Sequence, residues 1–237
     1  MKEKRTRILF VRHAEAEGNL NRIFHGWTDS ELTEKGHIQA EKVAERLKPV
    51  DIDVIYSSSL KRALQTAGYI SRVKNLPIIR TDRLKEINGG DWENKRWDVL
   101  PELWPEEYRT WEYEPHNHKM PNGESMHEFQ ARLIDEIHCI VNQHKGKNIC
   151  IVTHGTAIRA LLCHFYGCRP DEMQGIAWHD NTSITIVDYI DGSFHVVCEG
   201  DNSHLGPDLS TIDGQEWWKE YRKRVKGGNR FEAGQMG

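Results

Sequence analysis

Two segments of the chain contain a histidine that follows a run of apolar residues. Residues 7–13 are RILFVRH and end in Arg12 and His13, and residues 149–155 are ICIVTHG and contain His154. A neutral imidazole is a nucleophile, and the planar guanidinium of arginine matches the oxygens of a phosphate group. We therefore predict that His13 attacks a phosphoryl group that Arg12 holds.

A second arginine, Arg62, falls in the first turn of a predicted helix that follows a short apolar strand. In open α/β sheets, ligands bind beyond the carboxyl ends of the strands, near helix N-termini whose free N–H groups attract anions. Nearby positive charge lowers the pKa of a histidine, so the arginines would also keep His13 neutral. The side chains expected to meet around a phosphoryl group are Arg12, His13, Arg62 and His154.

Segments typical of strands and of helices alternate along most of the chain. The Ser57–Ser59 run is expected to cap a helix, and Ile38 is expected to face the core. The alternation predicts an α/β fold, with a mostly parallel sheet, an antiparallel edge strand and helices on both faces. The predicted strands are 8–11, 53–56, 76–80, 148–153 and a hairpin of 182–189 with 193–198, and the predicted helices are 33–47, 60–67, 123–144 and 156–165.

The bulk composition limits the partners of the protein. The 237 residues suffice for one large α/β domain, and the net charge of −4 does not attract nucleic acid or an anionic membrane, so we expect neither as a partner. The five cysteines are odd in number and form no CxxC pair, which indicates a reducing compartment. The N-terminal residues indicate neither a signal peptide nor a membrane span, and we expect a cytoplasmic protein.

Two stretches interrupt the alternation. Residues 86–122 are rich in Trp and acidic residues, and we interpret them as an insertion in a domain that spans residues 1–200. Its aromatic residues form a small core beneath an acidic face, act as a lid that holds an apolar or ring-bearing leaving group, or do both. Residues 201–237 form a C-terminal extension, with a short helix around Trp217 and Trp218 that could serve a homodimer, and a disordered tail at 227–237.

Six motifs follow one another along about residues 7–200. In order, these motifs are RHAEAEGN at 12–19, FHGWTDSELTEKG at 24–36, YSSSLKRALQTA at 56–67, LKEINGGDWEN at 84–94, PNGES at 121–125 and VTHGTAIRALL at 152–162. Together they resemble the histidine phosphatase superfamily, also called phosphoglycerate mutase-like. The resemblance implies the three-layer phosphoglycerate mutase-like fold, with the insertion over the active site.

The resemblance also implies roles for individual residues. The histidine that matches His13 takes up the phosphoryl group, while Arg12, Arg62 and His154 match residues that surround its oxygens. Glu86 matches the proton donor, which must be protonated to serve the leaving oxygen and can then activate water. No metal ion or cofactor is required. Further positions that we expect to contact phosphate or the rest of the substrate are Asn19, His25, Gly26 and Gly155.

One departure from the family pattern lies close to the predicted nucleophile. Ala16 stands where many members carry Ser or Thr, so a hydroxyl near the phosphate is missing. The thirteen histidines include several without clear metal-ligand spacing, and we predict no metal site.

We predict a metal-independent phosphomonoesterase that acts on a small phosphorylated metabolite through a phosphohistidine. A 2,3-bisphosphoglycerate-dependent mutase is the nearest alternative. It is less favoured because the insertion has only four basic residues among more numerous acids, whereas family mutases carry additional basic residues there. A phosphate-binding module without catalysis is an alternative of another class, against which the presence of all five expected positions speaks.

Overall fold

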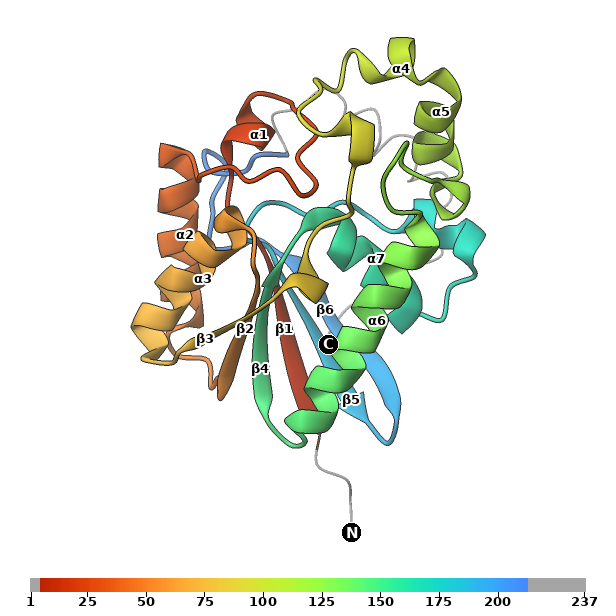
Figure 1. Ribbon diagram of the computed structural model, residues 1–237. Helices are drawn as coiled ribbons and strands as arrows, with labels where there is room; N and C mark the ends of the chain where they lie inside the picture. The colour runs from red at the N-terminus through yellow and green to blue at the C-terminus, as the bar shows by residue number, and fades with distance from the viewer. Residues whose placement is uncertain (1–4, 213–237) are drawn as a thin grey trace.

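A six-stranded sheet forms the centre of the structure, a computed structural model that describes residues 5–212 (Figure 1). The strands lie in the order β3-β2-β4-β1-β5-β6. Pairing is parallel from β3 through β1, and β5 is antiparallel to both of its neighbours. The strands are β1 (Thr6–Arg12), β2 (Val54–Ser58), β3 (Ile78–Thr81), β4 (Asn148–Thr153), β5 (Ile184–Ile190) and β6 (Ser193–Asp201).

Helices cover both faces of this sheet, as predicted (Figure 1). Side chains along a strand point alternately to opposite faces, and β1 follows this rule. Leu9 and Val11 join the core under α2 (Glu34–Leu47) and α3 (Lys61–Lys74). Ile8 and Phe10 join the core under α6 (Met126–Gln143) and α7 (Gly155–Phe165). β1 is therefore buried on both faces, which explains its unbroken apolar run.

The reversed strand lies next to the sheet edge. The antiparallel edge that we predicted is formed by the β5–β6 hairpin: β5 pairs antiparallel with β1, and the edge strand β6 pairs antiparallel with β5. The hairpin turns at Asp191 and Gly192, both of which have positive φ. Because β1, β2 and β4 are parallel, their carboxyl ends meet at one edge, which is where this fold binds ligands.

Two local predictions for the helices are wrong. α3 begins after Leu60 without a side-chain cap, and the hydroxyl of Ser58 instead contacts a buried histidine. Ile38 is 47% exposed on α2, because the burial of Gln39, Ala40 and Val43 places the core-facing side one residue further along the helix. α6 begins close to the predicted position, where Ser125 and Glu128 form a reciprocal capping box.

The insertion contains short helices around a compact aromatic core. α4 (Leu100–Leu103) and α5 (Pro105–Tyr113) were not predicted, since each is too short to show a clear period. Trp92 is fully buried and Trp111 is 8% exposed, and both pack with Phe24. The first interpretation, a small core, therefore holds for these two residues, which are not free to form a lid.

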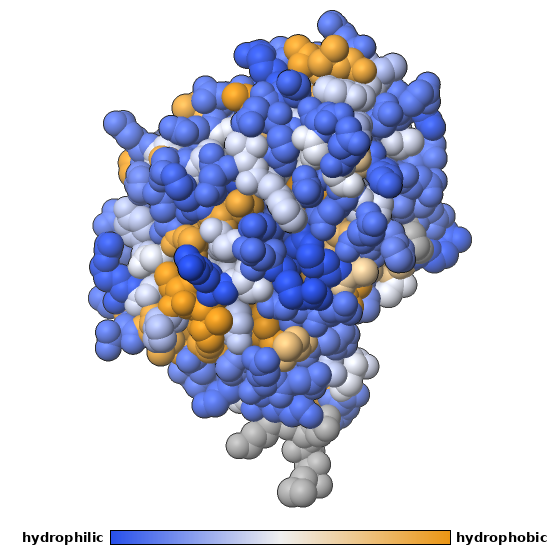
Figure 2. Space-filling model, in the orientation of Figure 1, coloured by the Kyte–Doolittle hydropathy of each residue, from blue (hydrophilic) through white to orange (hydrophobic). Residues whose placement is uncertain are grey.

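The molecular surface is predominantly hydrophilic on the face shown in Figure 2, in keeping with a mean hydropathy of −0.70. Among residues 5–212, no helix is long and apolar enough to cross a membrane. The predicted helix around Trp217 and Trp218 and the tail at 227–237 lie outside the described residues.

Candidate active site

His13 lies directly after the carboxyl end of β1 and is 3% exposed. Its Nδ1 is 2.7 Å from the carbonyl oxygen of Ala14. A carbonyl can only accept a hydrogen bond, so Nδ1 must carry the proton and the neutral ring must hold its lone pair on Nε2. The backbone is fixed as well, because the Asn181 side chain donates to the His13 carbonyl over 2.8 Å. Nε2 is thus the ring nitrogen whose lone pair remains free.

Arg12 reaches the same site from the last position of β1. Its Nη1 donates to the carbonyl of His179. Its Nε is buried and has no hydrogen-bond partner within residues 5–212. Burial lowers the pKa of Arg12, while the negative charges of Asp180 and Glu86 act in the opposite direction.

Arg62 lies in the first turn of α3 and is 1% exposed. Its Nη1 donates to the carbonyl of Thr28 over 3.0 Å, and its Nη2 donates to the carbonyls of His25 and Gly26 over 2.8 and 2.7 Å. Burial lowers the pKa of Arg62 to about 10, so the guanidinium remains charged at neutral pH. Its Nε is buried without a partner in the described part of the chain.

His154 is fully buried at the carboxyl end of β4, and its ring centroid is 5.2 Å from that of His13. Its Nε2 is 2.7 Å from the hydroxyl of Ser58, which also accepts a long bond from the backbone N–H of Leu60. The Ser58 hydroxyl can donate its proton to His154 Nε2, and in that tautomer the histidine proton lies on Nδ1. That Nδ1 is buried and without a partner among residues 5–212.

The site keeps its histidines neutral. Burial, followed by the charges of Arg62 and Arg12, holds the pKa of His13 well below its usual range. The same causes, in the same order, lower the pKa of His25, whose ring centroid is 6.0 Å from that of His13. For His154, burial and the charge of Arg62 again lower the pKa most strongly. Three neutral imidazoles thus lie beside two cationic guanidiniums.

Glu86 shows the opposite behaviour. Its carboxyl is 9% exposed, and its oxygens accept from the backbone N–H groups of Ile87 and Thr156 over 2.9 and 3.0 Å. These hydrogen bonds favour the ionised form, but burial outweighs them and raises the pKa of Glu86. Thr156 belongs to the first turn of α7 and is two residues after His154 in the chain. The carboxyl of Glu86, which accepts from Thr156, therefore lies at the N-terminus of that helix.

The arrangement has the donors and the charge of an anion-binding site. Arg12 Nε and Arg62 Nε are buried N–H donors and His154 Nδ1 is a buried ring nitrogen, and none of the three has a hydrogen-bond partner among residues 5–212. Buried donors are normally paired, because an unpaired donor loses its hydration without compensation. A phosphoryl group offers three acceptor oxygens and negative charge. Among the described residues, no group of three or more His, Cys, Asp or Glu could hold a metal ion.

The structure places the remaining predicted substrate positions around this cluster in different ways. Asn19 lies in α1 (Glu17–Leu20), where its side-chain oxygen accepts from the Ala16 N–H over 3.1 Å. Gly26 contributes its carbonyl to Arg62. Gly155 is the first residue of α7, and a Cβ there would lie 3.2 Å from Arg12 Nε. Asn19 and Gly26 therefore act within the protein framework, and Gly155 lies against the Arg12 guanidinium.

Three site residues were missed from the sequence: Ser58, Thr28 and Asn181. Ser58 ends β2, next to the carboxyl end of β4, so the rule that ligands bind at this edge could have identified it. Thr28 accepts a hydrogen bond from Arg62 with its backbone carbonyl, and the side chain of Asn181 donates one to the backbone carbonyl of His13. No sequence pattern marks such contacts.

Residues 8–202 match the histidine phosphatase superfamily (branch 1). The chain belongs to this superfamily. This histidine phosphatase is 33% identical over 181 residues to "Phosphoserine phosphatase 1" of Hydrogenobacter thermophilus, covering 76% of this chain and 85% of that protein. The match confirms the resemblance inferred from the motifs and identifies the chain as a phosphatase enzyme.

The chain is also similar to a mutase and to a solved structure. The chain is 33% identical over 173 residues to the 2,3-bisphosphoglycerate-dependent phosphoglycerate mutase of Bartonella tribocorum, covering 70% of this chain and 84% of that protein. The solved structure of Bacillus stearothermophilus YhfR matches with a TM-score of 0.81 and 36% identity, over 84% of this chain and 98% of that one. The phosphoglycerate mutase-like fold is thereby confirmed.

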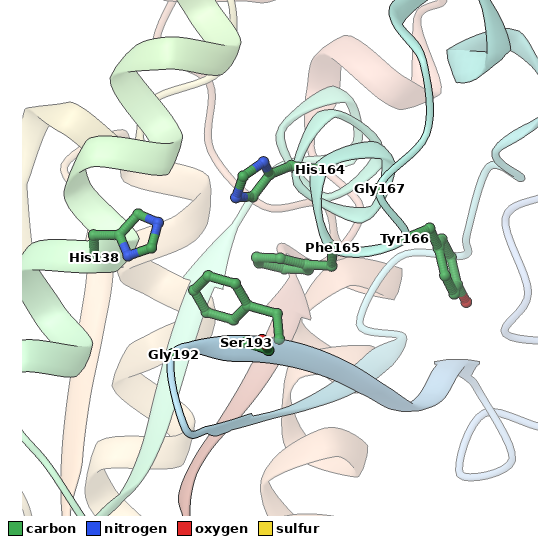
Figure 3. A pocket seen from close by; sticks show the side chains of 8 residues that line it. His138, His164, Phe165, Tyr166, Gly167, Gly192 and Ser193 are labelled. Atoms are coloured by element: carbon green, nitrogen blue, oxygen red, sulfur yellow. The ribbon is translucent and has the colours of Figure 1, made fainter.

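A separate hollow lies away from this cluster, at the end of α7 and beside the β5–β6 hairpin (Figure 3). It has a volume of about 410 Å³ and is open to solvent. Figure 3 shows His138, His164 and Phe165 gathered on one side, with Tyr166 directed away from them. It contains none of the predicted site residues.

Proposed function

We propose that this histidine phosphatase hydrolyses a small phosphomonoester through a phosphohistidine on His13, with no need for a metal ion or cofactor. The observation that carries the proposal is that three buried nitrogens, Arg12 Nε, Arg62 Nε and His154 Nδ1, have no hydrogen-bond partner within residues 5–212. They belong to the residues whose charges and rings surround the neutral imidazole of His13. A phosphoryl dianion satisfies them and lies within reach of the nucleophile.

The first step transfers the phosphoryl group to nitrogen. His13 Nε2 donates its lone pair to phosphorus, the bond from phosphorus to the ester oxygen breaks, and the protonated Glu86 carboxyl gives its proton to that oxygen. The alcohol leaves, and Glu86 is left as a carboxylate. The charge on the equatorial oxygens is stabilised by the guanidiniums and by the His154 N–H.

The second step releases phosphate. The Glu86 carboxylate takes a proton from a water molecule, whose oxygen attacks phosphorus, and the bond from phosphorus to His13 Nε2 breaks. The imidazole returns to its neutral form with its proton still on Nδ1, shared with the Ala14 carbonyl. Glu86 ends protonated and ready for the next cycle, and the raised pKa of Glu86 supports this role.

One observation favours hydrolysis over the mutase reaction. A mutase needs free basic groups for a second phosphate or a carboxylate, but two of the four basic residues of the insertion are engaged. Arg96 pairs with Asp98 over 2.7 Å, and Arg109 pairs with Glu114 over 2.7 Å. Because these two arginines are paired, they support water, rather than an oxygen of a second substrate molecule, as the acceptor of the phosphoryl group.

The proposal is tested by trapping the intermediate. The protein is mixed with ³²P-labelled phosphomonoester and quenched in alkali, since phosphohistidine survives base and is lost in acid. We expect acid-labile label on the wild-type protein and none on His13→Ala, with turnover reduced to background. Undiminished turnover by His13→Ala would disprove the mechanism. His195→Gln, on exposed strand β6, is the matched control and should label normally.

The substrate is sought with a panel of phosphomonoesters. Phosphoserine leads the panel because a relative carries the name phosphoserine phosphatase. Sugar phosphates, phosphoglycerates and nucleotides complete it. A coupled assay for conversion of 3-phosphoglycerate to 2-phosphoglycerate, primed with the bisphosphate, tests the mutase alternative. Failure to hydrolyse any ester, with retained phosphate binding, would favour the non-catalytic module.

A further inference from the structure

The orientation of Arg62 depends on a single loop. The two terminal nitrogens of its guanidinium donate to three backbone carbonyls, all within residues 25–28. These contacts decide where the N–H on Nε points. A shift of the loop would therefore move the Arg62 guanidinium, even though no loop side chain holds it.

The same loop is held from its other side by the Glu93 carboxylate. Oε1 accepts from the backbone N–H of Trp27 over 2.7 Å, and Oε2 accepts from the backbone N–H of Thr28 over 3.0 Å and from the Thr28 hydroxyl over 2.5 Å. Oε1 also accepts from the N–H of Gly89 over 2.9 Å. One side chain thus joins the 25–28 loop to the segment that begins at Glu86.

The fit between Glu93 and the loop is close. A Cβ on Gly26 would come 2.5 Å from Glu93 Oε1 and 2.1 Å from the carbonyl of Ile87, so only glycine allows this approach. Four hydrogen bonds to one carboxylate are more than a surface acid needs, and hydrogen bonds to a charged acceptor are among the stronger ones in proteins. The negative charge of Glu93 also favours the charged form of Arg62 and opposes the lowering of its pKa by burial.

We propose that Glu93 is the positioning residue for Arg62. Its carboxylate holds residues 25–28 in the shape that directs the Arg62 guanidinium to the phosphoryl group, and it ties that loop to the backbone next to the proton donor. This role rests on the proposed function above. It also assigns a purpose to the first turn of the insertion, which joins the phosphate clamp to the proton donor.

The first test is Glu93→Gln. A glutamine has one oxygen, so its NH₂ must face either the two N–H donors of Trp27 and Gly89 or the N–H donor of Thr28, and at least one N–H loses its acceptor whichever way the amide lies. We expect kcat/KM to fall by about tenfold to a hundredfold, and the Kd of inorganic phosphate, measured by calorimetry, to rise by a similar factor. Glu102→Gln, an exposed acid of the same insertion, is the matched control and should bind phosphate like the wild type.

A double-mutant cycle separates positioning from general damage. Phosphate affinity is measured for Glu93→Gln combined with Arg62→Lys and, separately, with Arg12→Lys. We expect the double variant with Arg62→Lys to lose little more phosphate affinity than Arg62→Lys alone. For the double variant with Arg12→Lys, we expect the losses in free energy of phosphate binding of the two single variants to add. Additive losses in both cycles, or unchanged phosphate binding in Glu93→Gln, would overturn the proposal.

A parallel cycle uses Glu93→Asp, which keeps the charge but is too short to accept hydrogen bonds from both the 25–28 loop and Gly89. This cycle tests the positioning role if Glu93→Gln does not fold. Folding of each variant is checked by circular dichroism. Absence of phosphate binding by the wild-type protein would overturn the proposed function. Normal binding by the wild type and by Glu93→Gln would overturn only the positioning role.

Discussion

His13 and Glu86 have pKa values shifted in opposite directions, although both are buried. For the imidazole, the charged form is the cation, which burial and two guanidiniums disfavour, so the pKa of His13 falls. For the carboxyl, the charged form is the anion, which burial disfavours more than the arginine and backbone N–H groups favour it, so the pKa of Glu86 rises. Both shifts favour the neutral form of the side chain, so they widen the pH range in which His13 is a neutral base and Glu86 a neutral acid.

The role of Glu86 predicts a dependence on the leaving group. Glu86→Gln keeps the shape but cannot donate the carboxyl proton, so we expect kcat on alkyl phosphates to fall by about 10²- to 10⁴-fold. 4-Nitrophenyl phosphate, whose leaving group needs no proton, should lose far less. Steady-state kinetics on both esters checks this, with Glu106→Gln on the exposed face of α5 as a control. Equal losses on the two esters would contradict proton donation.

The pKa shifts also predict the pH profile of kcat/KM. Activity requires neutral His13, whose pKa is lowered, so the acid limb should lie well below the usual value of about 6.5. Activity also requires protonated Glu86, whose pKa is raised, so activity should decline toward alkaline pH only above the usual carboxyl range. In Glu86→Gln the alkaline decline should disappear, while the contribution of substrate ionisation stays. An unchanged alkaline limb in that variant would assign the decline to another group.

At the scale of elements, the site depends on loops that approach one another. The segment after β1 meets the start of the insertion through paired backbone bonds, such as Phe24 N–H to the Lys95 carbonyl over 2.8 Å. Ile23 and Arg96 form an isolated bridge at the same place. Where the backbones of two loops approach each other this closely, the residues at the contact must be small. The strands and helices fix the ends of these segments, and the loop contacts fix the guanidinium.

Gly26→Ala tests this loop contact. The added methyl group would collide with the Ile87 carbonyl and the Glu93 carboxylate, so the loop must shift. We expect at least a tenfold loss in phosphate affinity, roughly the loss of one charge-assisted hydrogen bond. Gly68→Ala in α3 is the matched control, because a Cβ there meets nothing within 4 Å. It should keep affinity and stabilise the protein by about 0.5–1 kcal/mol. Normal affinity in Gly26→Ala would show that the loop adapts.

At the scale of the molecule, polar and charged side chains at one edge of the sheet are buried as deeply as the apolar core. His154, Arg62 and Ser58 are each at most 1% exposed at the same sheet edge. Such groups cost hydration free energy, which a bound anion would partly restore. The empty protein is therefore expected to be less stable than its phosphate complex.

Stability should fall as the solution becomes acidic. His13, His25 and His154 have lowered pKa values in the folded state, and the pKa of His118 is lowered to about 4 by burial. The unfolded chain therefore binds more protons below pH of about 6.5, and at pH of about 5.5 each such histidine lowers the free energy of unfolding by about 1.4 kcal/mol. The raised pKa of Glu86 opposes this slightly.

Urea unfolding at pH 7.5 and 5.5 measures this effect. We expect a loss of several kcal/mol at the lower pH, largely recovered by saturating phosphate where it still binds. His195→Gln, which alters an exposed histidine, should show the same pH dependence as the wild type. An equal free energy of unfolding at both pH values would contradict the assignment of neutral buried histidines.

The sequence alone predicted the strands of the sheet, the long helices that flank it and the residues that meet at the sheet edge. The apolar run before His13 and the matching run before His154 are visible because strands buried on both faces have continuous apolar sequences. Placement of Arg62 in the first turn of a helix followed from the same local rules. The family motifs then singled out Glu86.

Only the tertiary structure decided how those residues are oriented. Ser58 was expected to cap a helix but contacts His154, because β2 and β4 are neighbours and a hydrogen bond 96 residues apart leaves no local pattern. Glu93 was one acid among many in the insertion until its carboxylate was found against residues 27 and 28. Local periodicity encodes which face of an element is buried. Contacts between loops depend on the packing of the whole chain, which short-range sequence rules do not contain.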